Sequence, residues 1–529
     1  MLVKFIISLI PFGIYLWIKS KHSVHMLQQN WYNEGNRYIK WIWKNKKIVF
    51  CSLELLCILF AFGFILTDVW TMVLFVTFYT VLSLILLHQQ GKAQNKLPLK
   101  FTKRVKRLFI TIYLVYLIPI IVMVLFYQEQ YLTIYYLIIG FMAYMNYYMV
   151  YVANGINHPI EKAINHSFKR KAMKKLNSMN IKVIGVTGSY GKTSSKNILS
   201  DILNMKYNAL PTPKNFNTPL GLIMTINNHL DKFNDILIAE MGAFKQGEVK
   251  ELCDLVHPSY GIVTKIGTAH LESFGSQKNI QKGKFELIES LPQDGIGVLN
   301  ADDPLQVSYK LKNTCKIVWI GIDNEKANIR AENIKLGFDG TTFDVRFKDN
   351  DKKYSFTTKL LGQANVYNIL AGIALGHEFG MTIEQLQAGV KKVKPVEHRL
   401  EMKKMGNINI IDDAYNSNPV GAKMALDTLK LMPGKKIVVT PGMIEMGIEQ
   451  NKLNWTFGEQ IAEVADAVIL VGEKQTEPIY QALIKKKYKQ ENIYVLNDVK
   501  MAFPLMQTLS EKDTYVLLEN DLPDIFNER

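Results

Sequence analysis

Cysteine is scarce in this sequence. The 529 residues include four cysteines, which have neither the number nor the spacing of a disulfide framework or a zinc site. They are Cys51, Cys57, Cys253 and Cys315. This scarcity excludes a disulfide-stapled secreted scaffold and favours a reducing, cytosolic setting for the thiols.

The sequence also lacks a basic segment interleaved with aromatic residues, which is the pattern typical of nucleic-acid binding. The formal net charge is +16, but much of the excess lies in the first 176 residues, beside long apolar runs. Lys and Arg that flank apolar runs are typical of contact with a membrane surface. We therefore predict membrane lipid as a partner and no nucleic acid.

Long apolar runs dominate the first part of the chain. Four of them are long enough, at about 20 residues, to cross a bilayer as helices. They are residues 48–67, 69–88, 108–127 and 131–152. A fifth run, 2–18, is shorter and contains Pro11, so a spanning helix and an interfacial helix both remain open. No small-residue cleavage site follows it, which argues against a signal peptide.

The distribution of Lys and Arg predicts the orientation of these helices. Segments 19–47 and 92–107 each carry seven Lys or Arg residues, whereas the turns at 67–68 and 128–130 carry none. Positively charged loops remain inside, so we expect a multi-pass protein of the cell membrane whose remaining residues are cytoplasmic. Glu54 is the main charge within the runs, which favours an anchor over a transporter.

Residues 181–203 have the pattern of a strand, a glycine-rich turn and a helix. The turn reads TGSYGKT at 187–193. Such a turn directs backbone N–H groups and the positive end of a helix at the phosphates of a nucleotide. Lys192 would reach the outer phosphates and the Thr193 hydroxyl would bind Mg²⁺. The general nucleotide-binding motif is not matched, because Val186 stands where that motif has glycine.

The variant motif T-G-[ST]-x-G-K-T begins the ATPase domain of the Mur ligases, and further segments resemble the same family in the family's order. They are PTPKNFNTPLG at 211–221, ILIAEMG at 236–242, the run 264–303, LGQANVYNILAG at 361–372, EHRLE at 397–401 and DDAYNSNP at 412–419. The run 264–303 is most similar to members that add a D-alanyl-D-alanine dipeptide. The resemblance covers about residues 180–520.

The resemblance implies two α/β domains after the α-helical transmembrane region: a P-loop Mur ligase central domain and a Rossmann-like C-terminal domain. Short apolar strands after residue 406 alternate with helical patterns, which independently predicts a parallel sheet there. The expected domains are a membrane region at 1–155, a basic connecting helix at 156–180, the central ATPase domain at 181–397 and the C-terminal domain at 398–529.

The resemblance also implies the residues of an ATP and Mg²⁺ site. Thr193, Glu240, His270 and Lys284 match the metal-binding positions, and Lys284 matches a lysine that is carbamylated in many members. Lys282 is the nearby competitor for that role. The nucleotide-binding positions are Thr187, Gly188, Ser189, Gly191, Lys192, Thr193, Asn365, Arg399 and Tyr415. Of these, Asn365 matches an adenine-contacting asparagine, Tyr415 lies where the family has an aromatic ring near the base, and Arg399 matches an arginine that reaches the γ-phosphate. Asp413 lies in the motif that helps to place that arginine.

The implied reaction is carboxylate–amine ligation through an acyl phosphate. An acceptor carboxylate from the cell envelope attacks ATP, and an amino acid or short peptide then supplies the amine. Lys192, Glu240, His270, Lys284, Arg399 and Asp413 are the expected catalytic residues.

Three departures concern the substrates and the nucleotide. Membrane helices replace the soluble domain that binds a uridine nucleotide in the peptidoglycan ligases, so a lipid-linked acceptor enters consideration. Ala364 replaces a common histidine. Gly442 and Glu519 stand where the dipeptide-adding members usually have aspartate and lysine. A membrane polyglutamate synthetase and a non-catalytic ATP-binding scaffold remain as alternatives.

Overall fold

The computed structural model describes residues 1–50, 53–55, 68–92, 98–337, 340–414, 418–444 and 446–520. The chain divides into two compact units, Met1–Ser167 and Phe168–Arg529. The first is helical, and the second contains two sheets.

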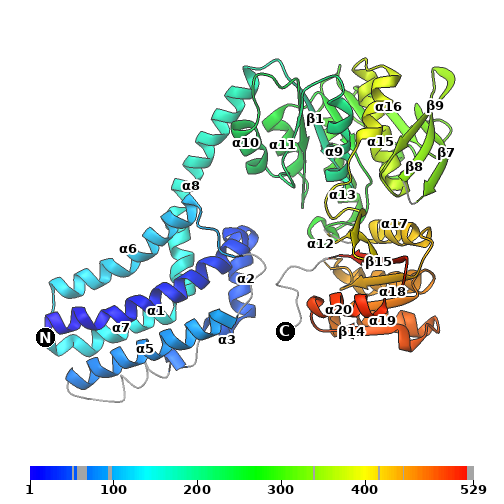
Figure 1. The fold of residues 1–529 in the computed structure, drawn as a ribbon. Helices are drawn as coiled ribbons and strands as arrows, with labels where there is room; N and C mark the ends of the chain where they lie inside the picture. Colours follow the sequence, from blue (N-terminus) through cyan, green and yellow to red (C-terminus); the bar gives the residue numbers. More distant parts are fainter. Residues whose placement is uncertain are drawn as a thin grey trace. The chain divides into compact units, whose positions relative to one another are not determined.

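The first unit is a set of helices that pack through one apolar core (Figure 1). Its helices are α1 (Leu2–Gln29), η1 (Trp31–Asn36), α2 (Arg37–Lys44), α3 (Lys46–Val49), α5 (Asp68–Lys92), α6 (Lys103–Leu125), η2 (Glu129–Tyr131), α7 (Leu132–Tyr144) and α8 (Asn146–Asn177). Among the described residues, three helices are long and apolar enough to cross a membrane: Leu2–Gln29, Trp70–Gln89 and Lys103–Leu125.

The apolar run predicted at 131–152 forms two helices instead of one. The pair Glu129–Tyr144 and Asn146–Asn177 is bent by 76° at the break. Side chains from elsewhere bond to carbonyl groups that precede it: the Tyr116 hydroxyl donates to Met142 O at 3.0 Å, and Lys19 Nζ donates to Ala143 O at 2.9 Å. Most of the run predicted at 48–67 lies outside the described residues.

Glu54, the charge noted within that run, is described and is buried. Lys19 Nζ lies 2.6 Å from Glu54 Oε2, and both side chains are almost inaccessible. The carboxylate is therefore paired inside the helical unit, which is how ionised groups persist in an apolar region.

The second unit begins with a nine-stranded sheet of order β2-β3-β1-β4-β5-β6-β7-β8-β9. Its strands are β1 (Lys182–Thr187), β2 (Ala209–Pro211), β3 (Ile236–Glu240), β4 (Tyr260–Val263), β5 (Ile296–Asn300), β6 (Lys316–Gly321), β7 (Ile329–Gly337), β8 (Gly340–Phe347) and β9 (Asn350–Thr358). The pairs from β2 to β7 are parallel, and the last three strands form an antiparallel extension.

Helices cover both faces of this sheet (Figure 1). One core joins the sheet to α9 (Lys192–Leu203), α15 (Gln363–Glu378) and α16 (Ile383–Lys392). The other joins it to α10 (Pro219–Asn228), α11 (Glu248–Val256), α13 (Gln277–Glu289) and the end of α8. The short helices α12 (Leu271–Phe274) and α14 (Pro304–Val307) follow strand ends.

The second sheet has six strands in the order β10-β11-β15-β12-β13-β14. They are β10 (Glu401–Met405), β11 (Ile408–Asp413), β12 (Lys436–Thr440), β13 (Ala467–Val471), β14 (Ile493–Leu496) and β15 (Thr514–Glu519). All the pairs are parallel except β10 with β11. The predicted parallel C-terminal α/β domain is therefore confirmed, and β10 adds an antiparallel edge.

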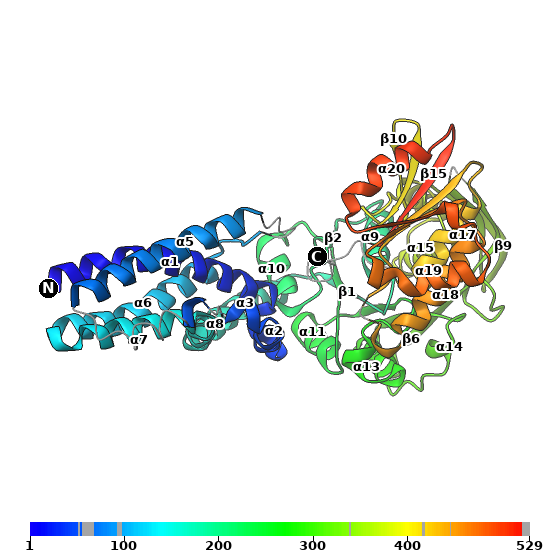
Figure 2. The ribbon, with the colours of Figure 1, turned by 90° about the horizontal axis from the view of Figure 1, so that it is seen from below.

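Helices also cover both faces of the second sheet (Figure 2). The helices α17 (Pro419–Lys430), α18 (Gln450–Ala462) and α19 (Glu473–Lys485) share one core with the sheet. On the other side lies α20 (Ala502–Leu509), and the remaining short turns are η3 (Gly447–Glu449), η4 (Gln490–Asn492) and η5 (Val499–Met501).

The topology gathers the loops that carry the predicted site. Strands β1, β3 and β4 are parallel neighbours that end at Thr187, Glu240 and Val263. Because the carboxyl ends of parallel strands meet at one edge of a sheet, the segments that follow them converge there.

Candidate active site

The loop between β1 and α9 has the backbone that a phosphate-binding turn needs. Gly188 has a φ of +148° and Gly191 a φ of +82°, values that side chains with a Cβ rarely adopt. A Cβ at Gly188 would also collide with the Thr264 hydroxyl. The Lys192 ammonium folds back over the loop and donates to Gly188 O at 2.9 Å.

The predicted loop residues differ in what they present to a ligand. The Thr187 hydroxyl is buried and donates to Met241 O at 2.9 Å, so it faces the sheet interior. The Ser189 N–H donates to Lys265 O at 2.9 Å. Lys192 remains the side chain of the loop that is best placed to meet phosphate.

Glu240 is the centre of a buried polar cluster. Its Oε1 accepts from the Thr193 hydroxyl at 3.1 Å and from Asn217 Nδ2 at 3.2 Å. Its Oε2 lies 3.2 Å from Lys196 Nζ. Lys196 is fully buried and also donates to Thr212 O at 2.7 Å. Lys196 thus ties the carboxylate to the segment before α10.

Electrostatics link His270 and Lys284 to the phosphate-binding lysine. Burial, with the charges of Lys192 and Lys284, lowers the pKa of His270 to about 4, so its ring is neutral at pH 7. Burial and the charge of Lys192 lower the pKa of Lys284 to about 7. Lys284 is 1% exposed, whereas Lys282 is exposed. Lys284 is therefore the lysine whose environment favours a reactive neutral amine.

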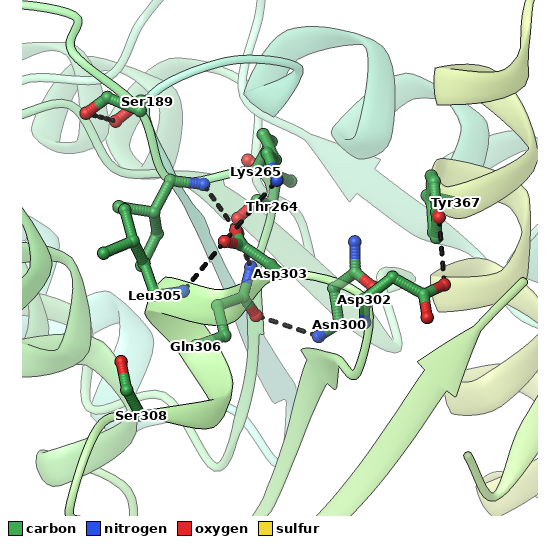
Figure 3. Close-up of polar contacts among 12 residues, drawn as sticks. Ser189, Thr264, Lys265, Asn300, Asp302, Asp303, Leu305, Gln306, Ser308 and Tyr367 are labelled. Atoms are coloured by element: carbon green, nitrogen blue, oxygen red, sulfur yellow. Dashed lines mark hydrogen bonds and ion pairs between the residues drawn. The ribbon is translucent and has the colours of Figure 1, made fainter. Parts of the chain in front are cut away.

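Asp303 holds the segment that leads to His270 (Figure 3). Its Oδ2 accepts from the Ile266 N–H at 2.9 Å, and Lys265 Nζ lies 3.5 Å from its Oδ1. Gln306 donates both to Asp303 at 3.0 Å and to Thr264 O at 2.8 Å. The buried Asp303 carboxylate therefore holds the segment between β4 and α12 through Lys265 and Ile266.

A cavity of about 590 Å³ lies between the two α/β domains. It is lined by Tyr190, Gly191 and Asn365 from the first domain and by Arg399 and Asp413 from the second. Asn365, in the first turn of α15, donates to Leu361 O at 2.8 Å. The phosphate-binding loop between β1 and α9 and the segment around Arg399 therefore line the same cavity.

Arg399 is close enough to act electrostatically on both domains. Burial lowers the pKa of Lys192, and the positive charge of Arg399 lowers it further. Burial raises the pKa of Asp413 to about 6, while Arg399 opposes that shift. Asp413 Oδ1 accepts from the Leu400 N–H at 3.2 Å, which ties it to the residue after Arg399.

The structure thus brings most of the predicted site residues to one region. Thr193 bonds to Glu240, and Glu240, His270 and Lys284 interact with Lys192 by charge. Tyr415 lies outside the described residues. Sequence reasoning missed Lys196 and Asp303; the one available signal for Lys196 was its place one helical turn after Lys192.

The donor set fits Mg²⁺. Glu240 Oε2 is a buried carboxylate oxygen without a hydrogen-bond partner among the described residues, although Lys196 Nζ lies 3.2 Å away. No group of three or more His, Cys, Asp or Glu residues is close enough to hold a metal in the described part of the chain. Mg²⁺ commonly takes one or two carboxylates and completes its shell with water and substrate phosphates.

Comparison with known families decides what kind of domains these are. Residues 186–376 match the Mur ligase middle domain, and residues 398–519 match the Mur ligase glutamate ligase domain. The chain belongs to the Mur ligase family. The Mur ligase match begins after the first unit and covers both sheets.

Curated relatives of this Mur ligase include two named UDP-N-acetylmuramoyl-tripeptide--D-alanyl-D-alanine ligase. The one from Bacillus subtilis (strain 168) is 33% identical over 276 residues, which cover 51% of this chain and 58% of the relative. The one from Escherichia coli (strain K12) is 32% identical over 304 residues, which cover 57% and 66%. The chain thus spans less than two thirds of either relative.

Solved structures show the same fold. The MurF ligase from Thermotoga maritima in complex with ADP superposes with a TM-score of 0.61 at 26% identity, covering 68% of this chain and 80% of that one. MurF from Acinetobacter baumannii gives a TM-score of 0.60 at 23% identity, covering 68% and 77%. The prediction of Mur ligase central and C-terminal domains is confirmed.

Proposed function

We propose that this chain is a membrane-anchored ligase that uses ATP to join a carboxylate to an amine on the cytoplasmic side of the cell membrane. The carrying observation is that the phosphate-binding loop, through Tyr190 and Gly191, lines one cavity with Arg399 of the other domain. The charge of Arg399 also acts on Lys192 of that loop. A nucleotide between them would meet positive groups from both sides. Phosphoryl transfer needs this arrangement, because negative charge spreads over the transferring group.

In the first step, the acceptor carboxylate attacks the γ-phosphorus of ATP and ADP leaves. Lys192 and Arg399 offset the charge that develops on the phosphoryl oxygens. Thr193, Glu240, His270 and Lys284, with Lys284 carbamylated, would hold Mg²⁺. The bound ion would neutralise phosphate charge.

In the second step, the amine attacks the carbonyl carbon of the acyl phosphate and phosphate leaves, which forms an amide. No side-chain nucleophile is required. The protein must instead position the amine and exclude water, because water would hydrolyse the acyl phosphate. The cavity between the domains suits this task, and Asp413 positions the Arg399 segment through the Leu400 N–H.

The membrane anchor supports a lipid-linked acceptor. The family match begins at residue 186, and helices that are apolar enough to span a membrane precede it. We propose the domain division 1–155, 156–180, 181–397 and 398–529, with the continuous helix α8 crossing the first boundary. An active site held near the inner leaflet would meet a lipid-linked cell-envelope carboxylate at high local concentration.

The names of the relatives suggest a peptidoglycan-type precursor as acceptor and a D-alanyl-D-alanine-like amine. By the family resemblance, we expect Gly442 and Glu519 to lie near the incoming amine. Gly442 has a φ of +78°, and its carbonyl accepts from Asn520 Nδ2 at 2.6 Å. Glu519, next to Asn520, is fully buried. We therefore propose an amino acid or a short peptide as the substrate that supplies the amine.

Trapping of the acyl phosphate tests this proposal. Detergent-purified full chain would be incubated with ATP, Mg²⁺, a lipid extract of cell-envelope precursors and hydroxylamine, with the Lys192→Ala variant as the matched control. We expect an ATP-dependent hydroxamate that the control does not form. Binding of ATP without hydroxamate from lipid or aqueous extracts would favour the scaffold alternative, and product lengthened by repeated glutamate units would favour a polyglutamate synthetase.

A further inference from the structure

Helices α6 and α8 of the first unit face each other through polar side chains. Arg107 donates to both oxygens of Glu161, at 2.8 and 2.9 Å. One turn further along α6, the Thr111 hydroxyl donates to Asn157 Oδ1 at 3.0 Å. Residues three and four apart share a helix face, so these pairs form successive contacts of one interface.

Arg104 is the next residue on that face, and its contact differs. Its guanidinium stacks on the Tyr32 ring, with 3.6 Å between the guanidinium carbon and the ring centroid. Its Nε is buried and has no hydrogen-bond partner within the described ranges. Both oxygens of Glu161 bond to Arg107. The residue as a whole is only partly buried, so an anionic acceptor from outside the chain can approach its guanidinium.

The surroundings hold Arg104 in place. Gln28 Nε2 donates to the Tyr32 hydroxyl at 3.3 Å, and Asn154 Nδ2 donates to Tyr32 O at 3.2 Å. Tyr32 is thus held at its hydroxyl and at its backbone carbonyl, which positions its ring under Arg104. Gln28 also bonds to the backbone of Lys100 in both directions, at 3.1 and 3.0 Å, which fixes the segment before α6.

The site lies where the charge of α6 is most positive. Thr102 caps the helix by accepting from the Val105 N–H at 3.3 Å, and the amino end of a helix attracts anions. Lys103 and Lys106 in the first turn are exposed. If α6, a candidate membrane span that starts at Lys103, crosses the bilayer, Arg104 would lie at the depth of lipid headgroups.

We propose that Arg104 binds the phosphate of a membrane lipid at the cytoplasmic end of α6. A guanidinium offers parallel N–H donors that match phosphate oxygens. Phe101, just before α6, and Ile110, within it, are 48% and 61% exposed and offer apolar surface suited to an acyl or isoprenyl chain. This favours a lipid over free phosphate. The site stands independently of the ligase reaction, and a lipid-linked acceptor with a phosphate belongs to the same ligand class.

Native mass spectrometry of the detergent-solubilised full chain tests this site with phosphatidic acid as the probe. We expect Arg104→Gln to weaken phosphatidic acid binding about tenfold, since one charge-assisted contact is lost. Lys106→Gln removes an exposed charge from the same helix turn and should change binding less than about twofold.

Competition identifies the source of the phosphate. Farnesyl diphosphate should displace phosphatidic acid, and inorganic diphosphate at the same concentration should not. Equal displacement by inorganic diphosphate would refute a lipid site. Unchanged binding by Arg104→Gln, or an equal loss in Lys106→Gln, would overturn the role of Arg104. If Arg104→Gln does not fold, Arg104→Lys takes its place, because it keeps the charge but lacks the parallel N–H donors of the guanidinium. Wild-type affinity for phosphatidic acid in Arg104→Lys would contradict recognition by the guanidinium.

Discussion

Lys196 Nζ lies 3.2 Å from Glu240 Oε2, and neither side chain is exposed to solvent. The pair connects α9 to the end of β3, directly behind the phosphate-binding loop. Lys196 also donates to Thr212 O and Lys214 O, at 2.7 and 2.5 Å. The carboxylate that is expected to hold Mg²⁺ is therefore held and partly neutralised before any ligand binds.

Removal of that lysine should destabilise the catalytic unit strongly. Lys196→Met keeps most of the apolar stem and leaves Glu240 as a buried unpaired charge, which costs about 3 to 5 kcal/mol. Thermal unfolding of the full chain would measure the change. Lys214→Met, at an exposed position, is the control.

A double-mutant cycle shows whether the two side chains act together. Glu240→Gln removes the charge that Lys196 balances, so the double variant should be less destabilised than the sum of the single changes by about 1 to 3 kcal/mol. Additive effects would mean that the pair is not coupled.

Lys284 should react with carbon dioxide more readily than an exposed lysine such as Lys282. Burial lowers its pKa to about 7, so at pH 7.5 much of it is a neutral amine, the form that becomes a carbamate. The rate of ADP formation should fall when bicarbonate is removed and recover when it is restored. Lys284→Ala should lose most activity, whereas the exposed Lys282→Ala should retain it. Equal sensitivity of the two variants would contradict this assignment.

Asp413 should make stability depend on pH. Burial raises its pKa in the folded chain to about 6, compared with about 4 in an unfolded chain. The folded state therefore retains a proton that the unfolded state loses, so this carboxyl lowers stability progressively as pH rises from about 4 to 6 and by a constant amount above that. Asp413→Asn should gain stability relative to wild type across the same window, by up to about 3 kcal/mol. A difference that does not vary with pH between 4.5 and 7.5 would rule this out.

Asp303 should control the order of the segment before His270. Asp303→Ala removes the acceptor of the Ile266 N–H and of Gln306, and each buried donor left unpaired costs about 1 to 3 kcal/mol. We expect a lower unfolding temperature and faster hydrogen exchange at residues 264–270. Asp294→Ala, at an exposed position, serves as the control. Wild-type exchange in Asp303→Ala would show that the segment is held by other contacts.

Local patterns predicted the site loop and several strands well. The turn at 187–193 has a distinctive sequence, and β12 and β14 coincide with the apolar stretches at 436–440 and 493–496. In these places, the strand is short, apolar and bounded by polar residues. Local sequence and tertiary packing therefore favour the same conformation.

Other features depend on contacts that a single sequence does not display. The break between α7 and α8 follows Tyr144 without a proline or glycine at Met145 or Asn146, and long-range bonds from Lys19 and Tyr116 accompany it. The burial of Lys196 is another case, because a lysine in a helix is ordinarily expected at the surface. Glu240 and Thr212 come from distant parts of the chain to surround it.

The most direct test of the central claim is amide formation by the purified full chain. Wild type and Lys192→Ala would each receive ATP, Mg²⁺, isotope-labelled amino acids and dipeptides, and separate lipid and aqueous precursor extracts. We predict ATP-dependent label in an organic-phase amide, formed by wild type and absent with Lys192→Ala. Label confined to a UDP-linked aqueous product would contradict the lipid-linked acceptor, and the absence of labelled amide from both phases would contradict the ligase itself.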